Sequence, residues 1–129
     1  MKFLIVGLGS IGQRHLRNLH RLGETDVLAY RARNLPLPEG LEVRVTDSLD
    51  DALDQCPDAV IVTNPTSFHM PVALSAARRG CHLFIEKPLS HNLDGVAELE
   101  ELVKKNRLQV LIGYHLRFHP DLCLIKTLL

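Results

Sequence analysis

Short apolar runs alternate with segments of helical periodicity along this 129-residue chain. The runs that predict strands are Lys2 to Val6, Asp26 to Tyr30, Glu42 to Val45, Ala59 to Thr63, His82 to Ile85 and Gln109 to Tyr114. Most of these runs are rich in β-branched residues and apolar on both faces, which is typical of parallel strands with helices on either side of the sheet. The alternation therefore predicts βαβ units that build a doubly wound, parallel six-stranded sheet in a three-layer α/β/α arrangement.

Helical periodicity fills most of the links between these strands. The predicted helices are Ile11 to Leu22, Leu49 to Gln55, Ser67 to Arg79 and Leu93 to Asn106. Ser48, with Asp51 three residues later, resembles a capping box, and Gly23 and Gly80 lie where a left-handed C-terminal cap belongs. The segment from Arg33 to Gly40 carries Pro36 and Pro38, so we expect a loop there.

Composition narrows the class of protein. Hydrophobic residues make up 46% of the chain and charged residues 23%, the balance of one soluble globular domain. Lys plus Arg equals Asp plus Glu at 15 each, without a basic run between aromatics, so we expect no nucleic-acid partner. The first apolar run is too short for a membrane span, which favours a cytoplasmic protein. Three scattered cysteines indicate neither a disulfide framework nor a metal site, but reduced, mostly buried thiols.

The stretch Gly7-Leu8-Gly9-Ser10-Ile11-Gly12 follows the first predicted strand and opens the first predicted helix. In that context G-x-G-x-x-G favours a dinucleotide-binding loop. Gly7 permits a tight turn, Gly9 lets a pyrophosphate approach the backbone, and Gly12 allows the helix to pack closely on the strand. Free amides at the helix start, at Ser10, Ile11 and Gly12, would hold the diphosphate. S-adenosylmethionine methyltransferases share such a loop, and a turn without a ligand remains an alternative.

The end of the second strand bears on the choice of dinucleotide. Where an acidic residue would bind the adenosine ribose, about 20 residues after the glycine motif, this chain has Arg31, followed by Arg33. A guanidinium can hold a 2′-phosphate by paired, charge-assisted hydrogen bonds, whereas a carboxylate would repel it. The pattern favours NADP over NAD, although both arginines can also be ordinary loop residues.

Three further strands end in unusual residues. With strand order 3-2-1-4-5-6, the ends of the first and fourth strands form the two lips of the ligand crevice. The fourth strand ends in Thr63-Asn64-Pro65, after which Thr66 or Ser67 could cap a helix that carries His69 in its first turn. By itself, a histidine there is as readily a capping or surface residue as a catalyst.

The fifth strand runs into Glu86-Lys87-Pro88, and the sixth into Gly113 and then Arg117-Phe118-His119-Pro120. Because carboxyl ends of parallel strands face the crevice, Glu86 and Lys87 should emerge where a nicotinamide ring and its substrate would lie. The proline leaves the strand end little backbone freedom, which suits a lysine aimed at a reacting oxygen. A solvated ion pair at a strand end is the plainer alternative.

Together these motifs resemble the N-terminal domain of the glucose-fructose oxidoreductase/inositol dehydrogenase/rhizopine-catabolism (Gfo/Idh/MocA) family. The resemblance covers nearly the whole chain and rests on the glycine motif, Thr63-Asn64-Pro65 with His69, Glu86-Lys87-Pro88, and Gly113 with Arg117-Phe118 and Pro120. It implies a Rossmann fold and an oxidoreductase that transfers hydride between NAD(P) and a sugar, inositol or related polyol.

The resemblance also implies roles for individual residues. Lys87 would lie beside the nicotinamide and the substrate oxygen, favouring a developing alkoxide or taking part in proton transfer. His69 is a second catalytic candidate. The motifs and the resemblance together give the expected cofactor-binding residues, which are Gly7, Gly9, Ser10, Ile11, Gly12, Arg31, Arg33, Thr63, Asn64, Pro65, His69, Glu86, Lys87 and Arg117.

Family members continue into a second, larger α/β domain that forms most of the substrate pocket. We expect residues 1–118 to be the Rossmann domain and 119–129 to begin a linker helix toward that domain, so this chain alone should be inactive or weakly active. A catalytically silent, dinucleotide-binding or redox-sensing module is the alternative. The terminal apolar residues Leu122, Ile125 and Leu129 should be buried against the domain or a second copy of the chain.

Overall fold

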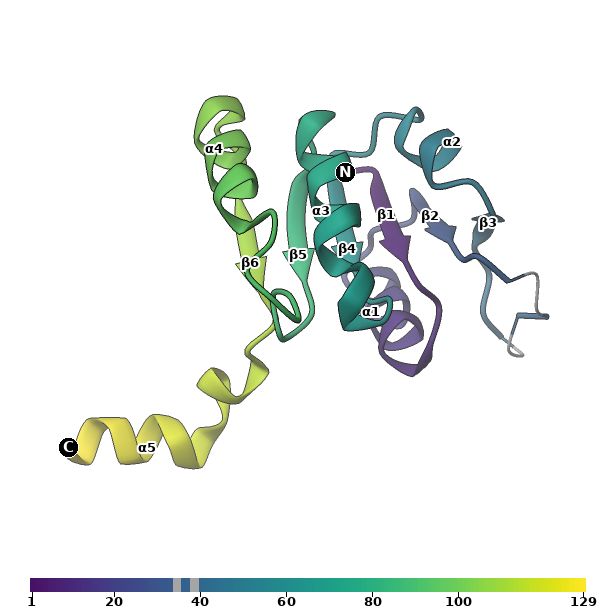
Figure 1. The fold of residues 1–129 in the computed structure, drawn as a ribbon. Coiled ribbons are helices and arrows are strands. Elements are labelled where there is room, and N and C mark those ends of the chain that lie inside the picture. The colour runs from purple at the N-terminus through teal and green to yellow at the C-terminus, as the bar shows by residue number, and fades with distance from the viewer. Residues whose placement is uncertain (34–35, 38–39) are drawn as a thin grey trace.

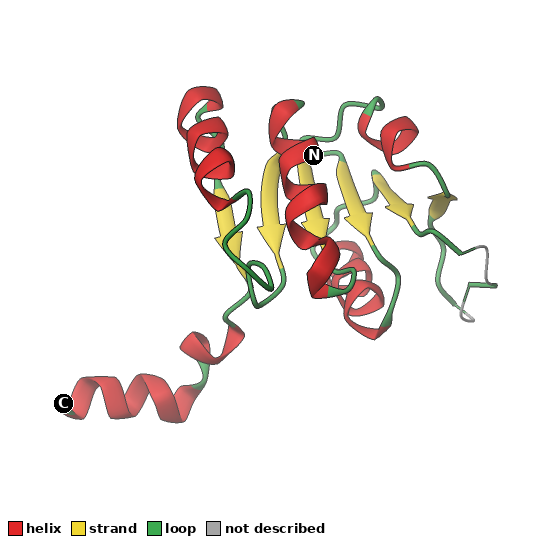
Figure 2. Ribbon diagram, viewed as in Figure 1, coloured by secondary structure: helices red, strands yellow, loops and turns green. Residues whose placement is uncertain are grey.

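A computed structural model describes residues 1–33, 36–37 and 40–129, and its centre is a parallel sheet of six strands. The strands are β1 (Phe3–Val6), β2 (Val27–Tyr30), β3 (Arg44–Thr46), β4 (Ala59–Val62), β5 (His82–Ile85) and β6 (Val110–Ile112). Their order is β3-β2-β1-β4-β5-β6, and all arrows point the same way in Figure 2. This order confirms the doubly wound sheet, with its topological switch point between β1 and β4.

Helices follow β1, β3, β4 and β5 and cover both faces of the sheet, and a further helix follows β6. They are α1 (Ser10–Arg21), α2 (Leu49–Leu53), α3 (His69–Arg78), α4 (Val96–Asn106) and α5 (Pro120–Leu128), with short 3-10 turns η1 (Thr66–Phe68) and η2 (His115–Phe118). Figure 1 shows α3 and α4 in front of the sheet and α1 behind it. The three-layer α/β/α arrangement is thereby confirmed.

Side chains alternate between the two faces of the sheet along each strand, so the hydrophobic core forms two clusters, one on each face. In β1, Leu4 and Val6 belong to the cluster that contains residues of α2, α3 and α4, whereas Ile5 belongs to the cluster with Leu16 and Leu19 of α1. Successive strand side chains point to opposite faces, so a strand buried on both faces must be apolar throughout. The continuous apolar runs in the sequence reflect this requirement.

Several predicted boundaries are confirmed by local geometry. The Ser48 hydroxyl accepts a hydrogen bond from the amide of Asp51 at 3.1 Å and caps α2. Gly23 and Gly80 follow helices with φ of +85° and +80°, as left-handed caps require. Residues 36, 37 and 40 of the predicted Arg33–Gly40 loop lie in neither a helix nor a strand, whereas Pro38 lies outside the described residues.

Other boundaries differ from the prediction for identifiable reasons. The last strand ends at Ile112 instead of Tyr114, because the amide of Tyr114 turns back to the Ile112 carbonyl at 2.7 Å. The fourth helix begins at Val96 instead of Leu93, after Gly95 with φ +77°. Neither Thr66 nor Ser67 caps α3: the chain first makes the η1 turn, and no side-chain cap bond is formed at either start.

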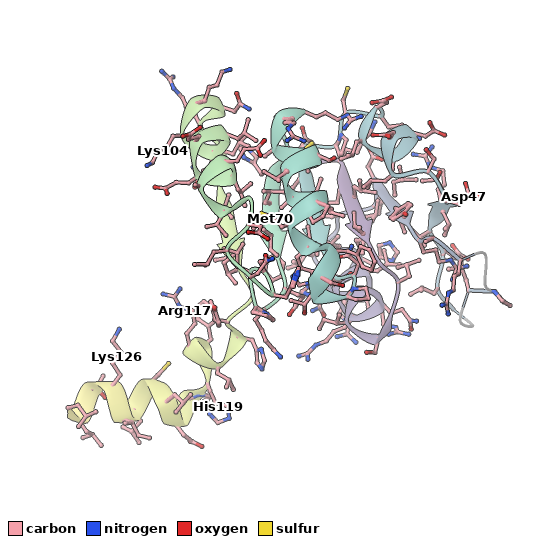
Figure 3. All side chains as sticks on the ribbon, in the orientation of Figure 1. Asp47, Met70, Lys104, Arg117, His119 and Lys126 are labelled. Carbon is pink, nitrogen blue, oxygen red and sulfur yellow. The ribbon has the colours of Figure 1, made fainter. Side chains whose placement is uncertain are left out.

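Two expectations about burial are wrong in part. Leu122, Ile125 and Leu129 are 45%, 51% and 102% exposed, so α5 is not buried against its own domain. Figure 3 shows Lys126 on this helix and His119 directly before it, and the helix lies apart from the sheet beyond η2. All three cysteines are free, but only Cys81 is buried. Burial raises the pKa of the Cys81 thiol above its ordinary value and keeps it protonated.

Candidate functional site

The residues that follow the strands lie in a row along the carboxyl edge of the sheet. Each extends the hydrogen-bond ladder by donating its amide to the last carbonyl of the neighbouring strand. These bonds run from Gly7 to Tyr30, Thr63 to Val6, Glu86 to Val62, Gly113 to Ile85 and Arg31 to Thr46, at 2.8 to 3.1 Å. Because neighbouring strands lie about 4.8 Å apart, the predicted motifs are fixed side by side on one edge.

The glycine loop is tight at two positions and open at the third. A Cβ at Gly12 would lie 1.9 Å from the Gly7 carbonyl oxygen, and one at Gly7, where φ is +102°, would lie 2.9 Å from the Asn64 nitrogen. At Gly9 nothing lies within 4 Å of a Cβ position. This open place before the start of α1 is where a pyrophosphate would approach the helix amides, so the loop fits a dinucleotide.

Thr63 holds the two lips of the crevice together. Its hydroxyl lies 2.6 Å from the Gly7 carbonyl oxygen and 3.1 Å from that of Val6, both potential acceptors. The side chain is buried, and its oxygen would lie 2.9 Å from a Cβ at Gly12. Thr63 therefore fixes the glycine loop against the end of β4.

A cleft of about 520 Å³ opens beside this loop. One wall is a face of α1, formed by Ile11, Arg14, His15 and Asn18, whose spacing of three and four residues places them on one side of the helix. The opposite wall comes from the ends of β4, β5 and β6. It includes Thr63, Asn64, Pro65, Thr66, His69, Phe84, Glu86, Lys87, Leu111, Ile112, Gly113, Tyr114, His115 and Phe118.

Glu86 and Lys87 leave β5 in different environments. The Glu86 carboxylate accepts a hydrogen bond from His15 Nε2 at 2.7 Å, and both side chains are largely buried. Lys87 is exposed, lines the cleft and is joined to Pro88 by a cis peptide bond. No hydrogen bond or ion pair to the Lys87 ammonium is found within the described part of the chain. The ammonium is thus available to a molecule in the cleft.

His69 connects two of the loops that line the cleft. Its side chain is only 2% exposed, with Nε2 at 2.8 Å from the Asn64 carbonyl oxygen and Nδ1 at 2.9 Å from that of Pro88. The ring therefore ties the end of β4 to the residues after Lys87. The Oδ1 atom of Asn64 is buried without a hydrogen-bond partner among the described residues, so it is left for a ligand or water.

Arg31 and Arg33 line a second pocket, at the β2–β3 end of the carboxyl edge of the sheet. A pocket of about 280 Å³ is lined by Arg31, Arg33, Val45, Thr46 and Asp47, after β2 and β3. The Nε atom of Arg31 is buried and has no partner among the residues that the structure describes. This pocket lies across β1 from the larger cleft, as the adenosine end of a dinucleotide would require.

Arg117 is the predicted site residue that the structure leaves apart. It lies on η2, lines neither pocket, and its guanidinium lies 5.4 Å from the centre of the Phe118 ring. Figure 3 shows it on the turn that leads into α5. The remaining predicted residues lie in the glycine loop or line one of the two pockets.

His15 is the site residue that sequence reasoning missed. It follows the glycine motif by one helical turn, so Gly12 and His15 share a helix face at spacing i, i+3. That spacing was the available signal, but its partner, Glu86, is 71 positions away and is joined to it only by the fold. Within residues 1–33, 36–37 and 40–129, no group of three or more His, Cys, Asp or Glu side chains could hold a metal ion, and no helix is long and apolar enough to cross a membrane.

Known proteins similar in sequence to this chain include dehydrogenases with the same fold. A family model described as "Oxidoreductase family, NAD-binding Rossmann fold" matches residues 1–114. Myo-inositol 2-dehydrogenase of Thermotoga maritima is 32% identical over 132 residues, which cover 98% of this chain and 40% of the relative. The scyllo-inositol 2-dehydrogenase (NAD(+)) of Bacillus subtilis is 32% identical over 123 residues, 90% of this chain and 36% of that protein.

Solved structures agree with the sequence comparison. Myo-inositol 2-dehydrogenase from Lactobacillus plantarum superposes with a TM-score of 0.88 at 26% identity, over 99% of this chain and 40% of that one. Scyllo-inositol dehydrogenase from Lactobacillus casei, with bound cofactor NAD(H) and scyllo-inositol, gives a TM-score of 0.81 at 26% identity, with the same coverage. The chain spans about two fifths of the length of the curated relatives it matches.

Proposed function

The chain belongs to the Gfo/Idh/MocA family of oxidoreductases with an NAD-binding Rossmann fold, and from this premise we propose that it is the cofactor-binding part of an NAD(P)-dependent dehydrogenase. The substrate class we propose is a sugar, an inositol or a related polyol. Relatives named as inositol dehydrogenases support this class. This chain spans only part of the length of those relatives. We therefore propose the complete reaction for a protein of their length, and we propose weak or no turnover for these 129 residues by themselves.

One observation carries the proposal: the open position at Gly9 and the Lys87 ammonium, which has no partner among the described residues, lie at the same sheet edge, on the two sides of the switch point. A dinucleotide laid across this edge would have its diphosphate at Gly9 and its nicotinamide end in the 520 Å³ cleft. Such a ligand would meet Thr63, Asn64 and Pro65 between these points.

The residues of the cleft have distinct proposed tasks. When bound, an oxidised nicotinamide supplies the acceptor for a hydride from the substrate carbon that carries the hydroxyl group. Lys87 would hold the substrate oxygen and stabilise the negative charge that develops on it. Since both nitrogens of the His69 ring already face backbone carbonyls, we assign His69 a positioning task in place of proton transfer.

We further propose that the cofactor is NADP. The buried Nε of Arg31, which has no partner in the described part of the chain, and the neighbouring Arg33 guanidinium would receive a 2′-phosphate in the 280 Å³ pocket. Asp47 lines the same pocket and could instead accept hydrogen bonds from the ribose hydroxyls of NAD. The names of two relatives refer to NAD, so NADP preference would set this chain apart from them.

Parallel titrations with NADPH and NADH, followed by nicotinamide fluorescence, test both proposals. We expect saturable binding, tighter for NADPH, and a loss of at least about tenfold in NADPH affinity, about 1.4 kcal/mol, when Arg31→Ala is combined with Arg33→Ala. NADH affinity should stay unchanged. Equal or tighter NADH binding would overturn the NADP assignment alone. Binding of neither would contradict the cofactor-binding function, and binding without turnover in a longer form of the protein would favour the silent module.

A second copy of the chain is the protein partner we propose. The exposed apolar residues of α5, among them Ile125 and Leu128, would be buried in that contact. A helix with so much apolar surface is stabilised by a covering partner.

A further inference from the structure

We propose that His15 is a positioning residue for the nicotinamide end of the cleft, acting through its hydrogen bond to Glu86. This inference rests on the proposed dinucleotide-binding function and adds to it. It assigns a task to a side chain of the pyrophosphate-binding helix that lies a full turn beyond the glycine motif.

The pair is short, enclosed and made between distant elements. His15 Nε2 lies 2.7 Å from Glu86 Oε1, and the two side chains are 18% and 15% exposed. His15 comes from the second turn of α1, whereas Glu86 is the first residue after β5. Hydrogen bonds that involve a charged group and are partly shielded from water are stronger than exposed ones. The pair therefore holds the helix wall of the cleft to its sheet wall.

Neighbouring groups fix the orientation of both partners. The His15 ring packs edge-on against Phe84, with ring centres 4.9 Å apart. The other carboxylate oxygen of Glu86 would lie 3.2 Å from a Cβ at Gly113, a tight contact that the glycine avoids. Imidazole and carboxylate thus lie between α1 and the ends of β5 and β6.

The position of the pair explains what it would do. Glu86 also donates its amide to the Val62 carbonyl at 3.0 Å, so its backbone and its side chain are both anchored. The next residue is Lys87, whose ammonium is unpaired among the described residues. With His15 in place, the carboxylate is turned toward α1, which leaves Lys87 free to meet a ligand. Without His15, the carboxylate can swing toward the Lys87 ammonium or into the space of the nicotinamide ribose.

Comparing NADH with ADP-ribose, which lacks the nicotinamide, separates a local task from a general structural one. His15→Ala should weaken NADH binding by about tenfold, or 1.4 kcal/mol, and leave ADP-ribose affinity within about twofold of wild type, or 0.4 kcal/mol. His15→Gln should largely restore NADH affinity, because its amide nitrogen can reach the place of Nε2. His15→Asn, whose amide nitrogen corresponds to Nδ1, should not.

Glu86→Gln provides a second route, because it changes the other partner without altering its shape. We expect it to weaken NADH binding, and to add nothing to His15→Ala when the two are combined. Circular dichroism and thermal unfolding of each variant report whether it folds. Equal losses for NADH and ADP-ribose, or no recovery with His15→Gln, would overturn the positioning task while leaving the cofactor function in place. If wild type bound neither ligand, the proposed function and this inference would fail together.

Discussion

Gly9 and Gly12 belong to one loop but meet opposite surroundings. Gly9 has φ −66°, which any residue can adopt, and a Cβ there would point into open space. A Cβ at Gly12 would overlap the Gly7 carbonyl at 1.9 Å. Gly9 is therefore open for a ligand, whereas Gly12 is required by packing.

We predict that Gly9→Ala leaves the free energy of unfolding unchanged but reduces NADPH affinity. Gly12→Ala should lower the free energy of unfolding by about 1 to 3 kcal/mol, the usual cost of overpacking, and reduce binding as well. Urea unfolding and fluorescence titration of both variants measure the two effects. Equal stability of the two variants would show that the close packing at Gly12 does not matter.

His69 also gives a prediction at the scale of one residue. Removing its ring in His69→Ala removes the group that lies between the Asn64 and Pro88 carbonyls and opens a cavity. We expect a loss of about 2 to 4 kcal/mol in the free energy of unfolding. Phe68→Ala is the matched control, because Phe68 is the preceding residue and is exposed. Similar losses for both variants would argue against a tie between the two loops.

Helix capping by two serines shows where the sequence predicted the start of an element correctly and where it did not. The sequence predicts that Ser48 caps one helix and that Thr66 or Ser67 caps the next. Ser48 caps α2 with a 3.1 Å bond, whereas Ser67 lies within η1 without a cap bond. Ser48→Ala should cost about 1 kcal/mol of unfolding free energy, with Ser48→Asp close to wild type. Ser67→Ala should cost nothing measurable. Urea unfolding would contradict this assignment if the two alanine variants lost equal amounts.

Apolar runs and capping residues predict most helices and strands of this chain, because these features depend on residues that are close together in the sequence. The apolar runs gave the sheet, and the strand order placed the motifs after β1, β4, β5 and β6 on one edge. What local signals missed depends on distant contacts. Gly95 starts α4 where a Cβ would lie 2.9 Å from Met70, and His15 finds Glu86 only once α1 lies against the sheet.

The apolar helix α5 leads to a prediction about the oligomeric state of the whole molecule. It lies apart from the sheet in Figure 1, with Ile125 and Leu128 exposed. If a second copy covers this helix, light scattering should give a molecular mass that rises with protein concentration toward that of a dimer. Ile125→Asp with Leu128→Asp should abolish the rise while the circular dichroism spectrum still reports a folded sheet domain. A wild-type chain that stayed monomeric at all concentrations would rule out this partner.

The most direct test of the account is to map where NADPH binds on the whole chain by amide chemical-shift changes in NMR. The account predicts that the largest changes follow the carboxyl edge of the sheet, at Gly7 to Gly12, Arg31, Asn64, Glu86 and Gly113. Residues of α4 and the loops at the amino edge should not shift. Changes centred on those regions, or no saturable change at all, would contradict dinucleotide binding at this edge.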